Sequence, residues 1–190
     1  MTVLHSYIAL RTQGHSRGSS RALRRVLDTA VVATLALAGT AAATNTDAED
    51  IAKIDACLSS AAAWKEAEMC IGTIDGPCQA AGSYSTQEMV ECVAREGRAW
   101  KSILDAQLAR LHANAKETDN SWSSGGTGPE LDAAMSEAQE AWIAFLESQC
   151  HYLRQLNFGG SIVRLNASSC YMRMTAERAI ELNRLDHRQN

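Results

Sequence analysis

The chain has 190 residues, of which 18 are basic and 22 acidic, and its formal charge is −4. This acidic balance argues against a nucleic-acid-binding protein, because a negative field repels nucleic acid. Only two prolines are present and apolar and polar residues show no sustained alternation, so strands are not predicted. Length and composition favour one mostly helical domain that can bury its own core.

The N-terminal segment has the three-part order of a secretory signal. Five arginines within the first 25 residues precede an apolar run over 26–38, and small residues then lead to Ala43. This order predicts cleavage after Ala43, with a signal peptide over 1–43 and a mature domain over 44–190. The alternative is a transmembrane anchor, but the run is shorter than the roughly 20 apolar residues required and contains Asp28.

Cleavage at this site changes the charge of the protein and predicts its location. Removal of residues 1–43 would leave 13 basic and 21 acidic residues, a formal charge of −8. A field of this sign attracts basic partners and repels anionic membrane surfaces, although plain solubility is the simpler explanation for it. We expect a periplasmic or secreted protein whose mature part has no membrane span.

The first two predicted helices of the mature chain are short. Residues 48–60 carry isoleucine and leucine at the spacing of one helical face. Residues 64–80 form a second helical segment, but two glycines and Pro77 weaken it. The later half of this segment is expected to be a turn.

The third predicted helix has the clearest signals. Ser85 is followed three residues later by Glu88, which together form a capping box. Apolar residues then recur at steps of three and four, and the helix is expected to end near Lys116. The apolar face consists of Val90, Val93, Gly97, Trp100, Leu104, Leu108 and Leu111.

A glycine- and serine-rich segment over 120–128 follows and is expected to be a loop. Trp122 lies within it as a large aromatic among small residues, the composition of an anchor for a partner protein. The alternative is that Trp122 folds back onto the helices. A phosphate-binding loop is not supported, because neither G-x-G-x-x-G nor G-K-[ST] is complete.

Two further helices complete the predicted fold. The fourth opens at Pro129 and reaches Leu156, and the last spans 167–185 after a glycine-rich break. The predicted stripe of the fourth is Leu131, Met135, Ala138, Trp142, Phe145 and Gln149. The last places Tyr171, Met174, Arg178, Leu182 and Leu185 on one side. We expect Trp100, Trp142 and Tyr171 to be core aromatics. The sequence thus predicts an all-α antiparallel bundle of about four to five helices.

All six cysteines lie after the predicted cleavage site, which fits disulfides formed in an oxidising compartment. Cys150 and Cys170 are expected on the two helices that flank the turn at 159–160. A bond between them would clamp that hairpin. Disulfides would therefore staple the bundle in addition to its hydrophobic core.

The four remaining cysteines allow three pairings among themselves. We favour Cys57 with Cys70 and Cys78 with Cys92. A Cys70–Cys78 bond is open only if the residues between them are not helical, since eight helical residues would separate the Cα atoms by about 12 Å.

Motifs for catalysis and cofactors are missing from the sequence. The mature chain has three histidines, His112, His151 and His187, at spacings that do not gather metal ligands on one helix face. The motifs C-x-x-C, H-E-x-x-H and G-x-S-x-G do not occur. A thiol–base pair of Cys150 with His151 is less favoured than a disulfide. We predict a protein that is not an enzyme and holds no metal or other cofactor.

Four short segments of the mature chain carry a resemblance to a known family. They are residues 85–92, residues 100–111, residues 138–145 with Cys150, and Cys170 with Thr175 and Arg178. In this order they resemble the lysozyme inhibitor LprI-like N-terminal domain family, from about Ile54 to Leu185. The resemblance implies a small, helical, disulfide-stapled domain outside the cytoplasm, and lysozyme inhibition through the family's named member.

The chain also departs from the family pattern. Glu140 and Leu146 stand where the family usually has arginine, and the L-N-x-x-Y motif is altered at Asp105. Glu147 and Arg178 match an acidic and a basic family position, and we expect them to pair between the last two helices. The alternative is that they are two solvated charges on separate faces, since exposed pairs contribute little.

Two functions from different classes follow from these observations. The first is an inhibitor that binds lysozyme or another basic envelope protein, with Trp122 as a candidate contact and the negative charge steering association. The second is an envelope structural or interaction domain that binds another periplasmic protein and has no lysozyme activity. Binding steered by charge should weaken as salt rises, which separates the two.

Overall fold

A computed structural model describes residues 38–82, 85–123 and 128–189, which belong to one compact unit, Leu37–Asn190. The helices are α1 (Ala38–Ser60), α2 (Trp64–Glu68), α3 (Asp75–Ala80), α4 (Thr86–Ser123), α5 (Leu131–Leu156) and α6 (Val163–Gln189). No strand occurs in the described ranges. The predicted all-α fold is confirmed, with six helices because the expected second helix is divided into α2 and α3.

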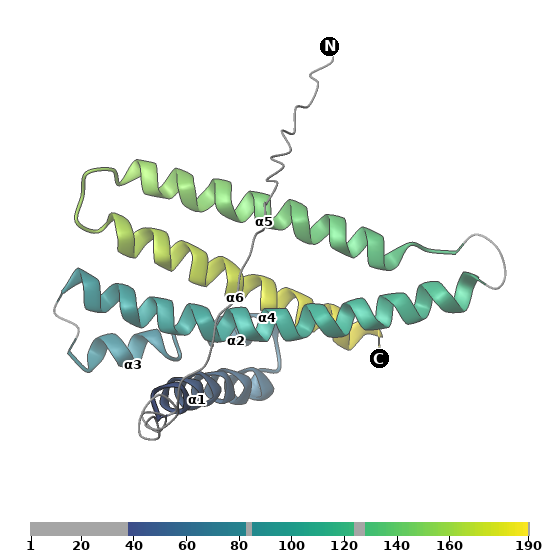
Figure 1. Ribbon diagram of the computed structural model, residues 1–190, viewed down its shortest axis with the longest axis horizontal. Coiled ribbons are helices and arrows are strands. Elements are labelled where there is room, and N and C mark those ends of the chain that lie inside the picture. The colour runs from purple at the N-terminus through teal and green to yellow at the C-terminus, as the bar shows by residue number, and fades with distance from the viewer. Residues whose placement is uncertain (1–37, 83–84, 124–127, 190) are drawn as a thin grey trace, which may run out of the picture. The chain divides into compact units, whose positions relative to one another are not determined.

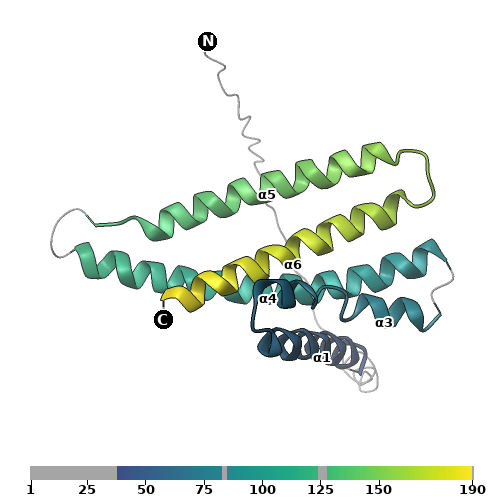
Figure 2. The same ribbon diagram turned by 180° about the vertical axis from the view of Figure 1, so that it is seen from behind.

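The three long helices form the body of the bundle. Figure 1 shows α6 lying between α5 and α4, and Figure 2 shows the same order from behind. α6 packs most extensively on α4, while α5 packs on both, and α1 and α3 cover the other side of α4. None of the helices in the described ranges is long and apolar enough to cross a membrane.

The main core lies where α4 meets α6 and α1. Trp100 is fully buried there, and Val93, Leu104 and Leu111 of the predicted α4 stripe are buried with it. Small residues on α6 allow this close packing, since Ala176 and Ala179 are both 0 % exposed. The apolar face predicted for α4 is therefore the face that holds the bundle together.

The N-terminal end of the described chain differs from the prediction. α1 begins at Ala38, ten residues before the expected start, and passes through the predicted cleavage site at Ala43. Residues 1–37 of the predicted signal lie outside the described residues. The expected face of α1 is present, because Ile54 is fully buried and Ile51 and Leu58 pack against the core.

The turn expected in the later half of 64–80 lies in its middle instead. Residues 69–74 form turns, and α3 follows with Pro77 near its start, where proline is tolerated. Gly72 has a φ of +104°, a left-handed conformation that glycine adopts without strain. The glycine therefore reverses the chain between α2 and α3, and the proline does not end a helix.

α5 is rotated relative to the predicted stripe. Phe145 is 59 % exposed, whereas Leu146 and Cys150 are buried against α6. Trp142 is half-buried. It packs against the main core and also against a smaller cluster formed by Leu146, Cys150 and Cys170. The prediction placed Phe145 on the inner face, and the contacts made by Cys150 with α6 turn it outward.

Three disulfides staple the helices. Cys57 is bonded to Cys70 between α1 and the turn after α2, and Cys78 is bonded to Cys92 between α3 and α4. The third bond joins Cys150 of α5 to Cys170 of α6. This is the pairing favoured by the sequence.

Candidate functional site

The tip of the α4–α5 hairpin carries a large exposed aromatic. Trp122 lies in the last turn of α4 and is 59 % exposed. A Cβ at Gly128 would lie 2.5 Å from the Cβ of Trp122, so only glycine fits where the chain returns past this side chain. Trp122 is therefore held at the base of the hairpin connection and presents its indole to solvent.

The first four residues of the predicted loop over 120–128 belong to a helix instead, because α4 continues to Ser123. Thr118 and Ser121 donate their hydroxyl groups to backbone carbonyls one turn earlier, at 3.0 and 2.7 Å. These bonds satisfy the side chains without ending the helix. Residues 124–127 lie outside the described residues.

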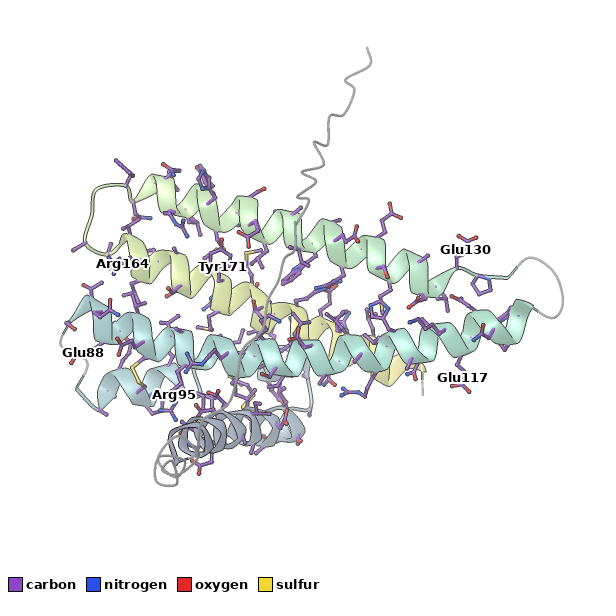
Figure 3. All side chains as sticks on the ribbon, in the orientation of Figure 1. Glu88, Arg95, Glu117, Glu130, Arg164 and Tyr171 are labelled. Atoms are coloured by element: carbon purple, nitrogen blue, oxygen red, sulfur yellow. A yellow bond between two sulfur atoms is a disulfide. The ribbon has the colours of Figure 1, made fainter. Side chains whose placement is uncertain are left out.

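Acidic side chains lie at the end of α4 and at the start of α5, the two segments that meet near Trp122. Asp119 accepts the backbone N–H groups of Leu131 and Asp132 at 2.9 and 3.0 Å, so α4 supplies the cap of α5. Glu117 on α4 and Glu130, just before α5, are both exposed, and Figure 3 shows them at the same end of the bundle, where α4 ends and α5 begins. Together, we call the surface formed by Glu117, Asp119, Trp122, Glu130 and Asp132 the acidic tip.

The electrostatics of the acidic tip are strongly one-sided. The described residues from 116 to 137 include five acidic residues and one basic residue, Lys116. Lys116 lies 3.9 Å from the carboxylate of Asp132, which also lies 2.6 Å from His112 Nδ1. The last turn of α4 has no basic residue, so its exposed carbonyl groups add partial negative charge. The tip therefore presents an aromatic group within a negative field.

The structure does not pair Glu147 with Arg178, which corrects that prediction. Glu147 accepts the hydroxyl of Tyr171 at 2.6 Å, and this bond, followed by burial, raises the pKa of Tyr171. Arg178 lies 2.8 Å from Glu181 and its guanidinium stacks 5.8 Å from the centre of the Trp142 ring. Glu147 is therefore bonded to Tyr171, and Arg178 is paired with Glu181.

The register between α5 and α6 explains the different partners. The disulfide Cys150–Cys170 aligns the two antiparallel helices, and this alignment places Trp142 opposite Arg178. Glu147 lies five residues further along α5, a displacement of about 7.5 Å along the helix. An ion pair across that distance would require both side chains to leave their present partners.

Two buried carboxylates were missed by the sequence reasoning. Asp50 is fully buried and accepts two bonds from the guanidinium of Arg95, at 2.5 and 2.7 Å, which joins α1 to α4. The bond to Asp50 raises the pKa of Arg95 against the opposing effect of burial. Figure 3 shows Arg95 on the side of α4 that faces α1. These residues have a structural role.

Glu96 is the second buried carboxylate and is also 0 % exposed. It accepts the backbone N–H groups of Gly72, Ile74 and Asp75 at 2.6, 2.9 and 2.7 Å, and the indole N–H of Trp100 at 2.9 Å. The turn between α2 and α3 is thus folded around one carboxylate. No signal in the sequence distinguishes Glu96 from the many surface glutamates.

Within the described parts of the chain, no group of three or more His, Cys, Asp or Glu side chains is placed to hold a metal ion. His112 contacts Asp132 at the acidic tip, and His151 is exposed on α5. The side chain of His187 lies outside the described residues.

Comparison with known proteins gives one match. The family model described as lysozyme inhibitor LprI matches residues 78–182, which is more than half of the chain. The matched segment is shorter than the one from Ile54 to Leu185 over which the sequence motifs resemble the family. It contains α4, α5, the acidic tip and four of the six cysteines. No curated protein and no solved structure matches the chain. Because this match covers more than half of the chain, the chain belongs to the lysozyme inhibitor LprI family.

Proposed function

We propose that this protein binds lysozyme through the acidic tip and inhibits it by covering the substrate cleft. The observation that carries the proposal is Trp122, 59 % exposed at the end of α4, in a part of the chain where acidic residues outnumber basic ones. Membership of an inhibitor family supports the choice of lysozyme as the target. Because the family is described as an inhibitor, we propose that the protein binds lysozyme without catalysing a reaction.

The chemistry of the tip suits a basic enzyme. Tryptophan is among the residues that contribute most to protein interfaces, because it buries a large rigid surface. The carboxylates around it attract a basic partner over a distance of about a Debye length, and this raises the association rate. Trp122 is the proposed anchor, while Glu117 and Glu130 provide steering.

Side-chain bonds connect the two helices at the acidic tip. Asp119 ties the start of α5 to the end of α4, and Asp132 contacts His112 and Lys116 on the neighbouring helix. A surface held in place before binding loses less conformational entropy on association. The end of α4 and the start of α5 are therefore tied to each other close to Trp122.

The proposal is tested by a turbidity assay of lysozyme acting on bacterial cell walls, with the protein fully disulfide-bonded. We expect stoichiometric protection at low salt that weakens at physiological salt. Glu117→Gln with Glu130→Gln should reduce protection severalfold. The control is Glu91→Gln with Glu140→Gln, which changes the net charge equally but lies away from the tip.

Equal loss in the two double variants would show that only the overall charge matters and would contradict a site at the tip. Absence of protection by the folded, fully bonded protein would contradict lysozyme inhibition itself.

A second candidate is an interaction domain for another envelope protein, with no effect on lysozyme. The observation in its favour is a set of exposed apolar residues on α5 and in the turn that follows it. Phe145, Tyr152, Leu156 and Phe158 are 59, 57, 61 and 83 % exposed. The first three lie seven and four residues apart, so they share one helix face. This face would be the surface to examine if lysozyme is not bound.

The location outside the cytoplasm has two supports, namely the three disulfides and the family. We propose in addition that residues 1–43 are a signal peptide removed after Ala43 during export. Cleavage there would leave the described helix α1 from residue 44 onward. Mass measurement of the exported protein tests this, since an intact N-terminus would contradict it.

A further inference from the structure

The turn between α5 and α6 exposes large apolar side chains. Phe158 is 83 % exposed, the highest value among the large apolar residues that the structure describes. Leu156 at the end of α5 and Ile162 just before α6 are 61 and 47 % exposed. We call Leu156, Phe158 and Ile162 the apolar turn. Exposed apolar side chains this close together mark a contact with a partner or a membrane.

The chain on both sides of the apolar turn is basic, although the protein is acidic overall. Residues 148–176 contain three arginines and no acidic residue. Arg154 lies in the last turn of α5, Arg164 lies in the first turn of α6, and both residues are exposed. Arg164 donates a long hydrogen bond of 3.4 Å to the uncharged side chain of Gln87. Within the described residues no carboxylate forms an ion pair with either arginine, so both can meet an anionic group.

The two arginines, Arg154 and Arg164, line an open cavity of about 230 Å³ beside the apolar turn. Its lining also contains the hydroxyl of Ser168 and apolar side chains from α4 and α6. The volume equals that of several water molecules, which is room for one phosphate group. Tyr171 lines the cavity too, but its hydroxyl is bonded to Glu147 at 2.6 Å. The guanidinium groups are therefore the charged donors of the cavity, and they suit phosphate because they bind its oxygens with two parallel N–H groups.

The acidic residues of α4 at this end are bonded within their own part of the chain. Figure 3 shows Glu88 near the same end of the bundle as Arg164. Glu88 accepts the backbone N–H of Ser85 at 2.8 Å, and Glu91 accepts the side-chain amide of Gln87 at 2.9 Å. They lower the positive potential beside α4 and leave the α5–α6 turn basic. We therefore expect an anionic partner to approach over α5 and α6 and not over α4.

The net negative charge of the protein predicts repulsion from anionic membranes, but distance limits this effect. Figure 1 shows the turn between α5 and α6 and the end of α4 at opposite ends of the bundle. α5 connects the two ends with 26 residues, about 39 Å of helix. At physiological salt the Debye length is about 8 Å, so the carboxylates of the acidic tip are screened from the apolar turn. The local arginines therefore decide what docks at this end.

We propose that the apolar turn docks end-on on an anionic lipid bilayer. In this arrangement the three apolar side chains enter the headgroup region, and Arg154 and Arg164 bind lipid phosphates. The arginines flank the turn on two helices, so end-on docking does not require them to share a helix face with the apolar residues. An uncharged apolar partner would leave both arginines without a counter-charge. The proposal is independent of the acidic tip, so its failure would leave the proposed lysozyme binding untouched.

The test is co-sedimentation of the exported, disulfide-bonded protein with large vesicles. One type of vesicle is an equimolar mixture of phosphatidylglycerol and phosphatidylcholine, and the other is phosphatidylcholine alone. We expect saturable binding to the anionic vesicles at low salt that weakens at physiological salt, and much weaker binding to the neutral vesicles. Absence of binding, or equal binding to the two types of vesicle, would overturn the proposal.

Aromatic variants show whether the apolar turn is the contact. Phe158→Ser should weaken vesicle binding about tenfold, and it should keep the fold because the side chain is already exposed to water. The control is Phe145→Ser, at an exposed position in the middle of α5, which should leave vesicle binding unchanged. Both variants keep the N-terminus of the parent, so a difference between them reports the turn. Equal binding by the two variants would overturn the proposal.

Charge variants test the role of the arginines. Arg154→Gln with Arg164→Gln should weaken binding to anionic vesicles about 25-fold, since one basic residue near an anionic surface contributes about fivefold. The control Lys65→Gln with Lys101→Gln changes the net charge equally at exposed positions on α2 and α4. Equal loss in the two double variants would overturn the proposal. It would also fail if the protein sediments as a dimer that Phe158→Ser converts to a monomer, because the turn would then bind a second copy of the chain.

Discussion

Replacement of Glu96 by glutamine tests whether this buried carboxylate holds the turn between α2 and α3. Oε1 accepts the N–H groups of Gly72 and Trp100, and Oε2 accepts those of Ile74 and Asp75. Glutamine keeps one oxygen and replaces the other by an amide nitrogen, so two of the four donors lose their acceptor in either orientation.

The magnitude follows from which donors are affected. Each pair contains one fully buried donor and one half-buried donor. A buried donor without an acceptor costs about 1–3 kcal/mol, and a half-buried one less because water can reach it. We expect Glu96→Gln to lower the free energy of unfolding by about 2–4 kcal/mol. The melting temperature should fall by roughly 10 °C.

The assay is equilibrium unfolding in urea, followed by far-UV circular dichroism with the disulfides intact. Glu91→Gln on the exposed side of the same helix is the matched control and should change stability by less than about 0.5 kcal/mol. A similarly small effect of Glu96→Gln would show that the buried carboxylate does not hold the turn.

Three further predictions concern the scaffold. Asp50→Asn should destabilise the protein by about 1–3 kcal/mol in urea unfolding. This is less than for a fully buried ion pair, because the side chain of Arg95 is one-third exposed. An unchanged midpoint of urea unfolding would contradict this prediction. Tyr171 has a raised pKa, so its contribution to stability should be complete below pH about 10 and lost as the pH rises through the folded-state pKa. The free energy of unfolding should depend less on pH in the alkaline range in Tyr171→Phe than in the parent protein. Identical pH profiles of the two proteins would contradict this prediction. Gly72→Ala should cost about 1–2 kcal/mol through backbone strain alone, whereas Gly76→Ala, without a positive φ, should not destabilise.

Local signals in the sequence predicted the parts of the fold that depend on neighbouring residues. The capping box at Ser85 is formed, with Glu88 Oε2 accepting the backbone N–H of Ser85 at 2.8 Å. The apolar steps along α4 identified Trp100 and Leu104 as core residues. A helix start and a buried stripe are encoded within a few turns of chain, so one sequence is sufficient to find them.

Features that depend on distant segments could not be predicted. Glu96 meets a turn 21 to 24 residues away, and nothing near it in the chain marks it as buried. The rotation of α5 and the separation of Glu147 from Arg178 follow from the way α5 packs on α6. Only Trp122 of the acidic tip was predicted as a contact, because Asp119 meets the start of α5 only in the folded structure.

Paired affinity measurements can show whether Trp122 anchors lysozyme at the acidic tip. Calorimetry should compare Trp122→Ala with Phe158→Ala, which removes an equally prominent aromatic, 83 % exposed, from the turn after α5. We expect Trp122→Ala to weaken lysozyme binding about 30-fold or more, while Phe158→Ala stays within about twofold of the parent. Unchanged binding by Trp122→Ala, or a larger loss in Phe158→Ala, would contradict the proposed site.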